Sequence, residues 1–166
     1  MDTKNTTSFS SIYESFLSKI TDDMYMELSK EDTNKILEEL LVSSIPKFEF
    51  PRFNIFDYEK GKDDNTVGYF NSILTKEEIN IIATYMIVEW LGQQLASVEN
   101  TRMKYSGTDF KFTSQANHMQ KLLTIKKDYE REGFHLQRLY KRRIVDKDGN
   151  IRSRMNIIIS PKEGRE

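Results

Sequence analysis

The sequence predicts a mainly α-helical protein: a four-helix bundle-like domain with an aromatic extended segment and a C-terminal β-hairpin. Apolar residues recur at three- and four-residue spacing in four stretches, which is the helical period. Only three prolines interrupt the 166 residues. Near the C-terminus, Asp146–Gly149 separates two extended stretches, as in a hairpin turn. We therefore expect a helical domain over residues 1–142, with its aromatic extended arm over 46–74, and a hairpin with a tail over 143–166.

The first two helices are predicted by short apolar stripes. A helix over about Ser8 to Ile20 carries the stripe Phe9, Tyr13, Phe16, Leu17 and Ile20. A second fits Lys30 to Ser44, with Ser29 as its N-cap and the stripe Ile36, Leu37, Leu40 and Leu41. Ile45 precedes a proline, which disfavours the α conformation, so we expect the second helix to stop there.

The stretch from Lys47 to Tyr58 is unusually aromatic. Its aromatic side chains are Phe48, Phe50, Phe53, Phe56 and Tyr58. Their partial alternation predicts extended chain, while Pro51 argues against a central strand. Two interpretations remain open: an arm packed over the helical core, or an apolar lip that a neighbouring subunit or partner covers. A solvated turn over 59–65 and a short extended piece over 67–74 follow.

Two long helices complete the helical part. Thr75 and Glu78 form a capping box at the start of the first, which continues to about Val98 and is apolar most of the way round. Such a helix lies at the centre of a bundle or between subunits. Gly92 inside this helix indicates a point where another helix crosses it closely. The second runs from about Ser114 to Arg142 with a near-heptad seam, and Gly133 is a candidate bend.

The C-terminal segment alternates in the manner of a hairpin. Its arms are 143–145 and 150–159, and Gly149 suits the positive φ of the turn. A hairpin of this kind is marginal alone and needs a sheet or a partner to rest on.

The sequence lacks the residue patterns that several classes of function require. The absence of cysteine excludes disulfides and thiolate chemistry, and His118 and His135 are not spaced as metal ligands. The acidic pairs are adjacent in sequence and so form no dyad by themselves, and Asp146–Gly149 is too short for a calcium loop. No phosphate loop or nucleophile elbow is present. We expect no enzyme, no metal, no cofactor, no secretory signal and no membrane span.

Charge is distributed unevenly along the chain. Residues 1–101 carry 9 Lys and Arg against 18 Asp and Glu, whereas residues 102–166 carry 16 against 8. The basic cluster at the end of the long helix and in the hairpin comprises Arg138, Lys141, Arg142, Arg143, Arg152 and Arg154. Three interpretations remain open: a solvated helix end that complements the helix dipole, a contact with an acidic protein, or a contact with DNA.

Four stretches are similar to another group of proteins. They are LLVSSIPKFEFP (40–51), LTKEEINIIATYM (74–86), YSGTDFKF (105–112) and LQRLYKRR (136–143). Together with the order of the helices, they resemble head-to-tail adaptor (connector, or neck) proteins of tailed bacteriophages over roughly residues 9–145. The resemblance implies a structural virion protein that assembles in the host cytoplasm as a homo-oligomeric ring, commonly a dodecamer. Such a ring binds the portal, receives the tail or a stopper protein, and passes genomic DNA through its lumen.

The resemblance gives each candidate site a role. The basic cluster is expected to contact the portal or the DNA channel, and the aromatic arm to bridge subunits. Two alternatives to a neck ring remain: a DNA-binding or DNA-packaging accessory protein that uses the basic C-terminal half, and a tail-completion protein.

Overall fold

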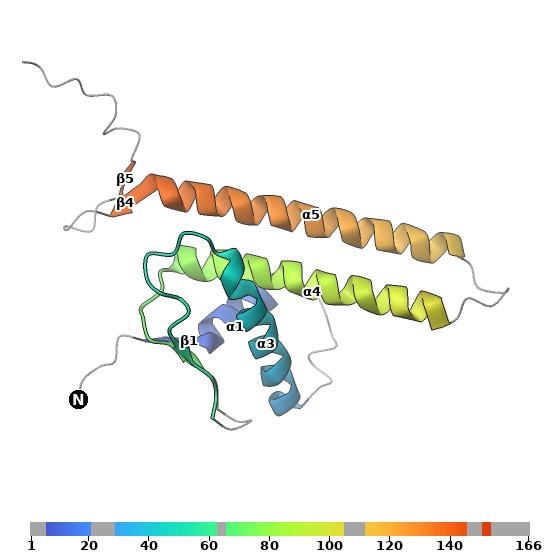
Figure 1. The fold of residues 1–166 in the computed structure, drawn as a ribbon, viewed down its shortest axis with the longest axis horizontal. Helices are drawn as coiled ribbons and strands as arrows, with labels where there is room; N and C mark the ends of the chain where they lie inside the picture. The colour runs from blue at the N-terminus through green and yellow to red at the C-terminus, as the bar shows by residue number, and fades with distance from the viewer. Residues whose placement is uncertain (1–5, 21–28, 63–65, 105–111, 146–150, 154–166) are drawn as a thin grey trace, which may run out of the picture.

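The structure is a computed structural model that describes residues 6–20, 29–62, 66–104, 112–145 and 151–153. These residues are mainly α-helical and include four α-helices (Figure 1): α1 (Phe9–Leu17), α3 (Lys30–Ser44), α4 (Lys76–Lys104) and α5 (Phe112–Arg142). A 3-10 turn, η1 (Ile45–Lys47), follows α3. The strands are β1 (Thr7–Ser8), β2 (Tyr58–Glu59), β3 (Tyr69–Phe70), β4 (Arg143–Val145) and β5 (Ile151–Ser153).

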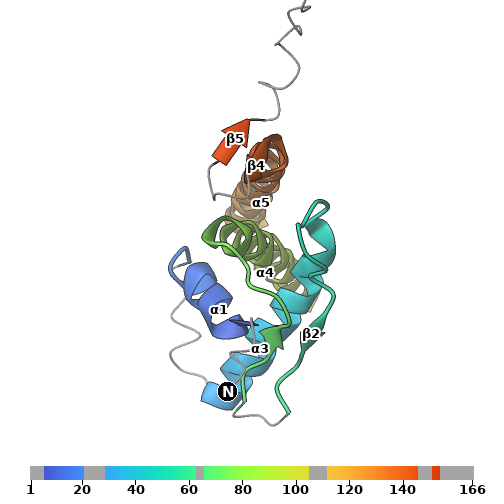
Figure 2. The ribbon, with the colours of Figure 1, turned by 90° about the vertical axis from the view of Figure 1, so that its left-hand side faces the viewer.

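Helix α4 lies in the middle of the molecule. The antiparallel helix α5 runs alongside it, while α1 and α3 pack across its other side (Figures 1 and 2). Every residue of α4 from Ile81 to Val88 is buried. The all-round apolar sequence of this helix therefore has its explanation in packing on several sides, as the sequence predicted. The layered arrangement differs from a bundle in which four helices share one axis.

The helix starts follow the predicted caps. The Thr75 hydroxyl accepts a hydrogen bond from the Glu78 amide at 3.3 Å, and the Glu78 carboxylate accepts one from the Thr75 amide at 2.7 Å. The Ser29 hydroxyl likewise accepts from Asp32 N at 3.1 Å. These bonds satisfy amides that the first turn of a helix leaves unpaired, so local sequence sets both starts.

The end of α3 corrects one expectation. The α-helix ends at Ser44, as predicted, but Ile45 retains the α conformation, with φ −50° and ψ −48°. The chain then continues into η1, in which Pro46 occupies an early position. A proline is tolerated there because the first amides of a helical turn have no intrahelical acceptor.

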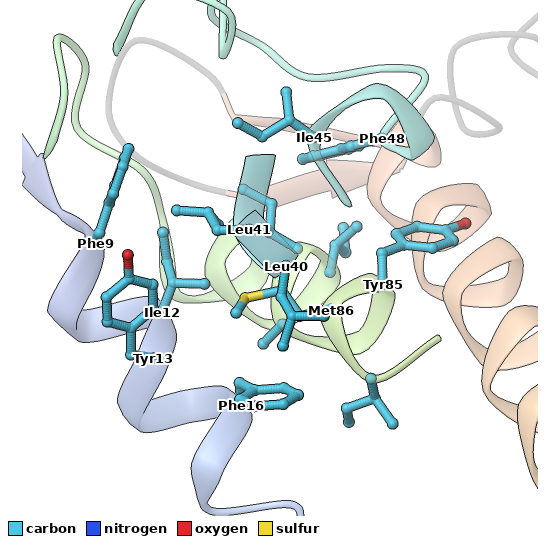
Figure 3. Close-up of a cluster of buried hydrophobic side chains, with 14 of the residues drawn as sticks. Phe9, Ile12, Tyr13, Phe16, Leu40, Leu41, Ile45, Phe48, Tyr85 and Met86 are labelled. Atoms are coloured by element: carbon cyan, nitrogen blue, oxygen red, sulfur yellow. The ribbon is translucent and has the colours of Figure 1, made fainter. Parts of the chain in front are cut away.

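A three-stranded antiparallel sheet, ordered β1-β3-β2, was not predicted. Phe70 of β3 pairs with Thr7 on one side and with Tyr58 on the other. Strands of two residues carry no readable alternation, which is why the sequence pattern does not reveal them. The sheet carries Phe70 into the core against Phe9, with ring centroids 4.9 Å apart. Figure 3 shows Phe9 within the cluster that α1, α3 and α4 share.

The crossing of the two long helices depends on a glycine, but not on the one expected. A Cβ at Gly133 would lie 2.7 Å from the Tyr85 ring, whereas a Cβ at Gly92 would meet only the end of the Lys126 side chain at 3.7 Å. Helix α5 is continuous through Gly133 and contains no break there. Gly133 is therefore the close-approach position, and the expectation for Gly92 was wrong.

The C-terminal strands pair as an antiparallel ladder. Arg143 of β4 lies opposite Ser153 of β5, and Ile144 lies opposite Arg152. The predicted turn and most of the predicted second arm, including Arg154, lie outside the described residues. The full hairpin over 143–159 therefore remains a prediction.

Candidate interaction surface

The basic cluster lies at the C-terminal end of α5. Arg138, Lys141 and Arg142 are exposed in its last two turns, where cations complement the helix dipole. Arg143 begins β4, and its guanidinium forms an ion pair with Glu77 of α4 at 2.9 Å. Arg152 is placed by its backbone on β5. The structure thus brings the described members of the cluster to one end of the molecule.

The aromatic stretch divides into two groups. Phe48 is 2% exposed, and Tyr58 packs its ring at 6.0 Å from Phe9, so both belong to the core. Phe50, Phe53 and Phe56 are 43%, 52% and 61% exposed. The prediction of an extended arm was wrong for most of this stretch, which is η1 followed by irregular chain until β2. Packing over the core is thus confirmed for Phe48 and Tyr58, while the apolar lip covered by a partner stays a prediction that concerns Phe50, Phe53 and Phe56.

The irregular chain over residues 48–57, between η1 and β2, is called the loop below. Gln137 holds the beginning of this loop in place. Its side-chain amide donates to the Lys47 carbonyl at 2.8 Å, and its oxygen accepts from the Glu49 amide at 2.8 Å. The same amide nitrogen donates to the Tyr85 hydroxyl at 2.5 Å. Gln137 is itself buried, so these bonds form away from water. A buried polar side chain with satisfied partners specifies one arrangement of the backbone it contacts.

Tyr140 holds the next part of the loop. Its hydroxyl accepts from the Arg52 amide at 3.1 Å and donates to the buried Glu78 carboxylate. Burial first, and the hydrogen bond to Glu78 second, raise the pKa of the Tyr140 hydroxyl well above its usual value. The tyrosine therefore stays protonated and acts as a donor at neutral pH. Loop, α4 and α5 meet at this one hydroxyl.

Further hydrogen bonds fix the far side of the loop. The Asn54 side chain accepts from Phe56 N at 3.1 Å, and the Asn71 amide side chain donates to the Asp57 carboxylate at 2.8 Å. Ile55, between the exposed phenylalanines, is fully buried. The exposed rings are thus carried by an anchored backbone. Because that backbone is already ordered, the loop itself would lose little conformational entropy if another surface covered these rings.

The two predicted sets of residues meet in a shallow groove. The Lys141 ammonium lies 3.9 Å from the centre of the Phe50 ring, and the Arg52 guanidinium lies 5.0 Å from the centre of the Tyr140 ring. Both distances are within the range of cation–π attraction. The groove has a volume of about 410 Å³ and is lined by Glu49, Phe50, Pro51, Arg52, Tyr140, Lys141 and Arg143.

Within the described parts of the chain, no three His, Asp or Glu side chains are grouped to hold a metal ion. His118 and His135 are both exposed on α5 and lie nearly five turns, about 25 Å, apart along the helix. The described helices include none long and apolar enough to cross a membrane. The groove itself brings cations and exposed aromatic rings together.

No known protein family, curated protein or solved structure matches the chain.

Sequence reasoning missed the residues that position the surface. Glu78 was read only as a capping residue, and Gln137 and Tyr85 were not singled out. One signal was present: Gln137 is a polar residue three positions before Tyr140, on the same face of α5. A polar residue on the face that carries buried residues such as Tyr140 indicates a buried hydrogen-bonded group.

Proposed function

We propose that this chain is a structural virion protein of a tailed phage, a head–tail adaptor that assembles as a ring, docks on the portal and connects capsid to tail around the DNA channel. The observation that carries the proposal is the anchored loop with Phe50, Phe53 and Phe56 exposed beside the cations of α5. Apolar side chains exposed on an ordered backbone are typical of surfaces that another protein covers.

Helix α5 offers a second surface for neighbouring copies. Leu123 and Phe134 are exposed on one flank of the helix and Ile125 on the other, on either side of the face that packs on α4. The acidic N-terminal part and the basic C-terminal part of the chain suit a head-to-tail contact between identical subunits. A contact of that type closes into a ring when its rotation allows. The predicted C-terminal hairpin would add strands to the portal or to a neighbour.

The test is the mass in solution, measured by light scattering with and without purified portal protein of the same phage. The proposal expects a large closed multimer, or co-migration with the portal. A chain that stays monomeric and does not bind the portal contradicts it. Substitution of Phe53 and Phe56 by serine serves as the matched variant and should weaken the association.

A DNA-binding or packaging accessory protein is the second candidate, because Arg138 and Arg142 are exposed and make no ion pair with a described residue. Such a protein binds duplex DNA with an affinity that falls steeply as salt rises. Neutralising these two arginines together with Arg152 and Arg154 should then remove DNA binding. If these changes instead abolish portal binding and leave DNA binding unaltered, the DNA candidate fails.

A further inference from the structure

The groove between the loop and the end of α5 carries its cations in an unusual setting. Arg52 and Lys141 are both exposed, and each lies over an aromatic ring. Neither forms an ion pair with a carboxylate among the described residues, although other cations of the chain do: Arg143 pairs with Glu77 and Lys47 with Glu89. The donors of Arg52 and Lys141 are thus held in position and remain available to an anion.

The rings point to a protein rather than a nucleic acid as the source of that anion. Proteins that bind single strands stack bases on open aromatic faces. Here Lys141 lies over the Phe50 ring and Arg52 over the Tyr140 ring, and Tyr140 is also 97% buried. The groove is also lined by the apolar side chains of Phe50 and Pro51 and by Glu49, which forms no ion pair with Arg52 or Lys141. The surface therefore offers two cationic positions beside apolar side chains.

We propose that this groove binds an extended acidic segment of a partner protein, with carboxylates at Arg52 and Lys141 and an apolar side chain against Phe50 and Pro51. An arginine accepts a carboxylate through two parallel hydrogen bonds, and a lysine through one charged donor. That the partner is another virion protein rests on the function proposed above. That the partner segment is acidic is inferred from the side chains of the groove alone.

The test is an NMR titration of the isotope-labelled full chain with a short synthetic peptide of alternating glutamate and leucine. The control peptide has glutamine in place of glutamate. The proposal expects shifts concentrated at Phe50, Arg52 and Lys141 with the acidic peptide. The double variant Arg52→Gln and Lys141→Gln should weaken binding about tenfold or more, since two charged hydrogen bonds are lost. The matched variant Lys121→Gln and Lys127→Gln, with exposed lysines elsewhere on α5, should bind as the unaltered chain does.

Three results would overturn the proposal. They are the absence of shifts with the acidic peptide, shifts spread evenly over all exposed lysines, and tighter binding of a single-stranded oligonucleotide that the double variant loses. The function proposed above has a separate readout. If the double variant and the unaltered chain both assemble with the portal while the peptide fails to bind, the groove proposal alone is wrong. If neither assembles, the adaptor function fails whatever the peptide does.

Discussion

Tyr140, near the C-terminal end of α5, donates a hydrogen bond to Glu78, in the first turn of α4, across 62 positions of sequence. The other oxygen of that carboxylate accepts from the Thr75 amide and hydroxyl, so a single side chain both caps α4 and joins it to α5. Glu78 is 1% exposed. A buried carboxylate without such donors would carry a large desolvation cost.

Replacing Tyr140 by Phe should lower the free energy of unfolding by about 1–3 kcal/mol, because Glu78 and the Arg52 amide each lose a buried partner. Urea denaturation measures the effect. Tyr129→Phe is the control: this half-buried tyrosine of α5 makes no hydroxyl hydrogen bond to any described residue, so its variant should stay within about 0.5 kcal/mol of the unaltered chain. Equal losses in the two variants would show that the Glu78 contact contributes nothing specific.

Replacing Gly133 by Ala should destabilise the protein by about 1–3 kcal/mol, because the added methyl group would overlap the Tyr85 ring at the helix crossing. Gly92→Ala should instead raise the free energy of unfolding. Its methyl group meets open space apart from Lys126, and alanine favours the helix by about 0.5–1 kcal/mol. Thermal or urea unfolding of both variants measures the two changes in stability. Stabilisation by Gly133→Ala would contradict the crossing geometry.

Stability should fall as the pH rises above about 10. Burial raises the pKa of the Tyr13, Tyr85 and Tyr140 hydroxyls above the usual value of 10.0, so these groups keep their protons when the unfolded chain loses them. The stability they contribute is complete below pH 10 and is lost as the pH rises through the folded-state values, with a slope of up to about 1.4 kcal/mol per pH unit for each group. Lys19 acts in the opposite direction, since burial lowers its pKa.

Urea titrations at about pH 9 and pH 11 measure this loss. The Tyr140→Phe variant provides the check, because it lacks one of the three hydroxyls and should lose less stability between the two pH values. If this variant loses as much stability between the two pH values as the unaltered chain, the Tyr140 hydroxyl does not contribute to the pH dependence.

Serine at Phe53 and Phe56 should leave the free energy of unfolding within about 1 kcal/mol, since both rings are exposed, yet should weaken assembly or portal binding by about tenfold or more. Phe48→Ala should instead cost about 3–5 kcal/mol as a core truncation. Ile73→Ser, at an exposed apolar residue before α4, is the control for a general loss of surface hydrophobicity. Light scattering reports assembly, and an equal effect of the Ile73 variant would argue against a specific role for the loop.

The sequence by itself determined the helices. Serine and threonine caps act within three or four residues, and the apolar period is a local property, so the start of α3 at Lys30 and of α4 at Lys76 could be predicted closely. The basic character of the end of α5 was equally readable.

Only the tertiary structure decided how the aromatic and basic residues combine. Phe48 and Phe50 are two positions apart and chemically identical, yet one is buried against Tyr140 and the other lies exposed beneath Lys141. That difference follows from Gln137 and Tyr140, which bind the loop backbone from 88 positions away. Local pattern holds no information about partners so distant in sequence, because their contact depends on the packing of α5 against α4.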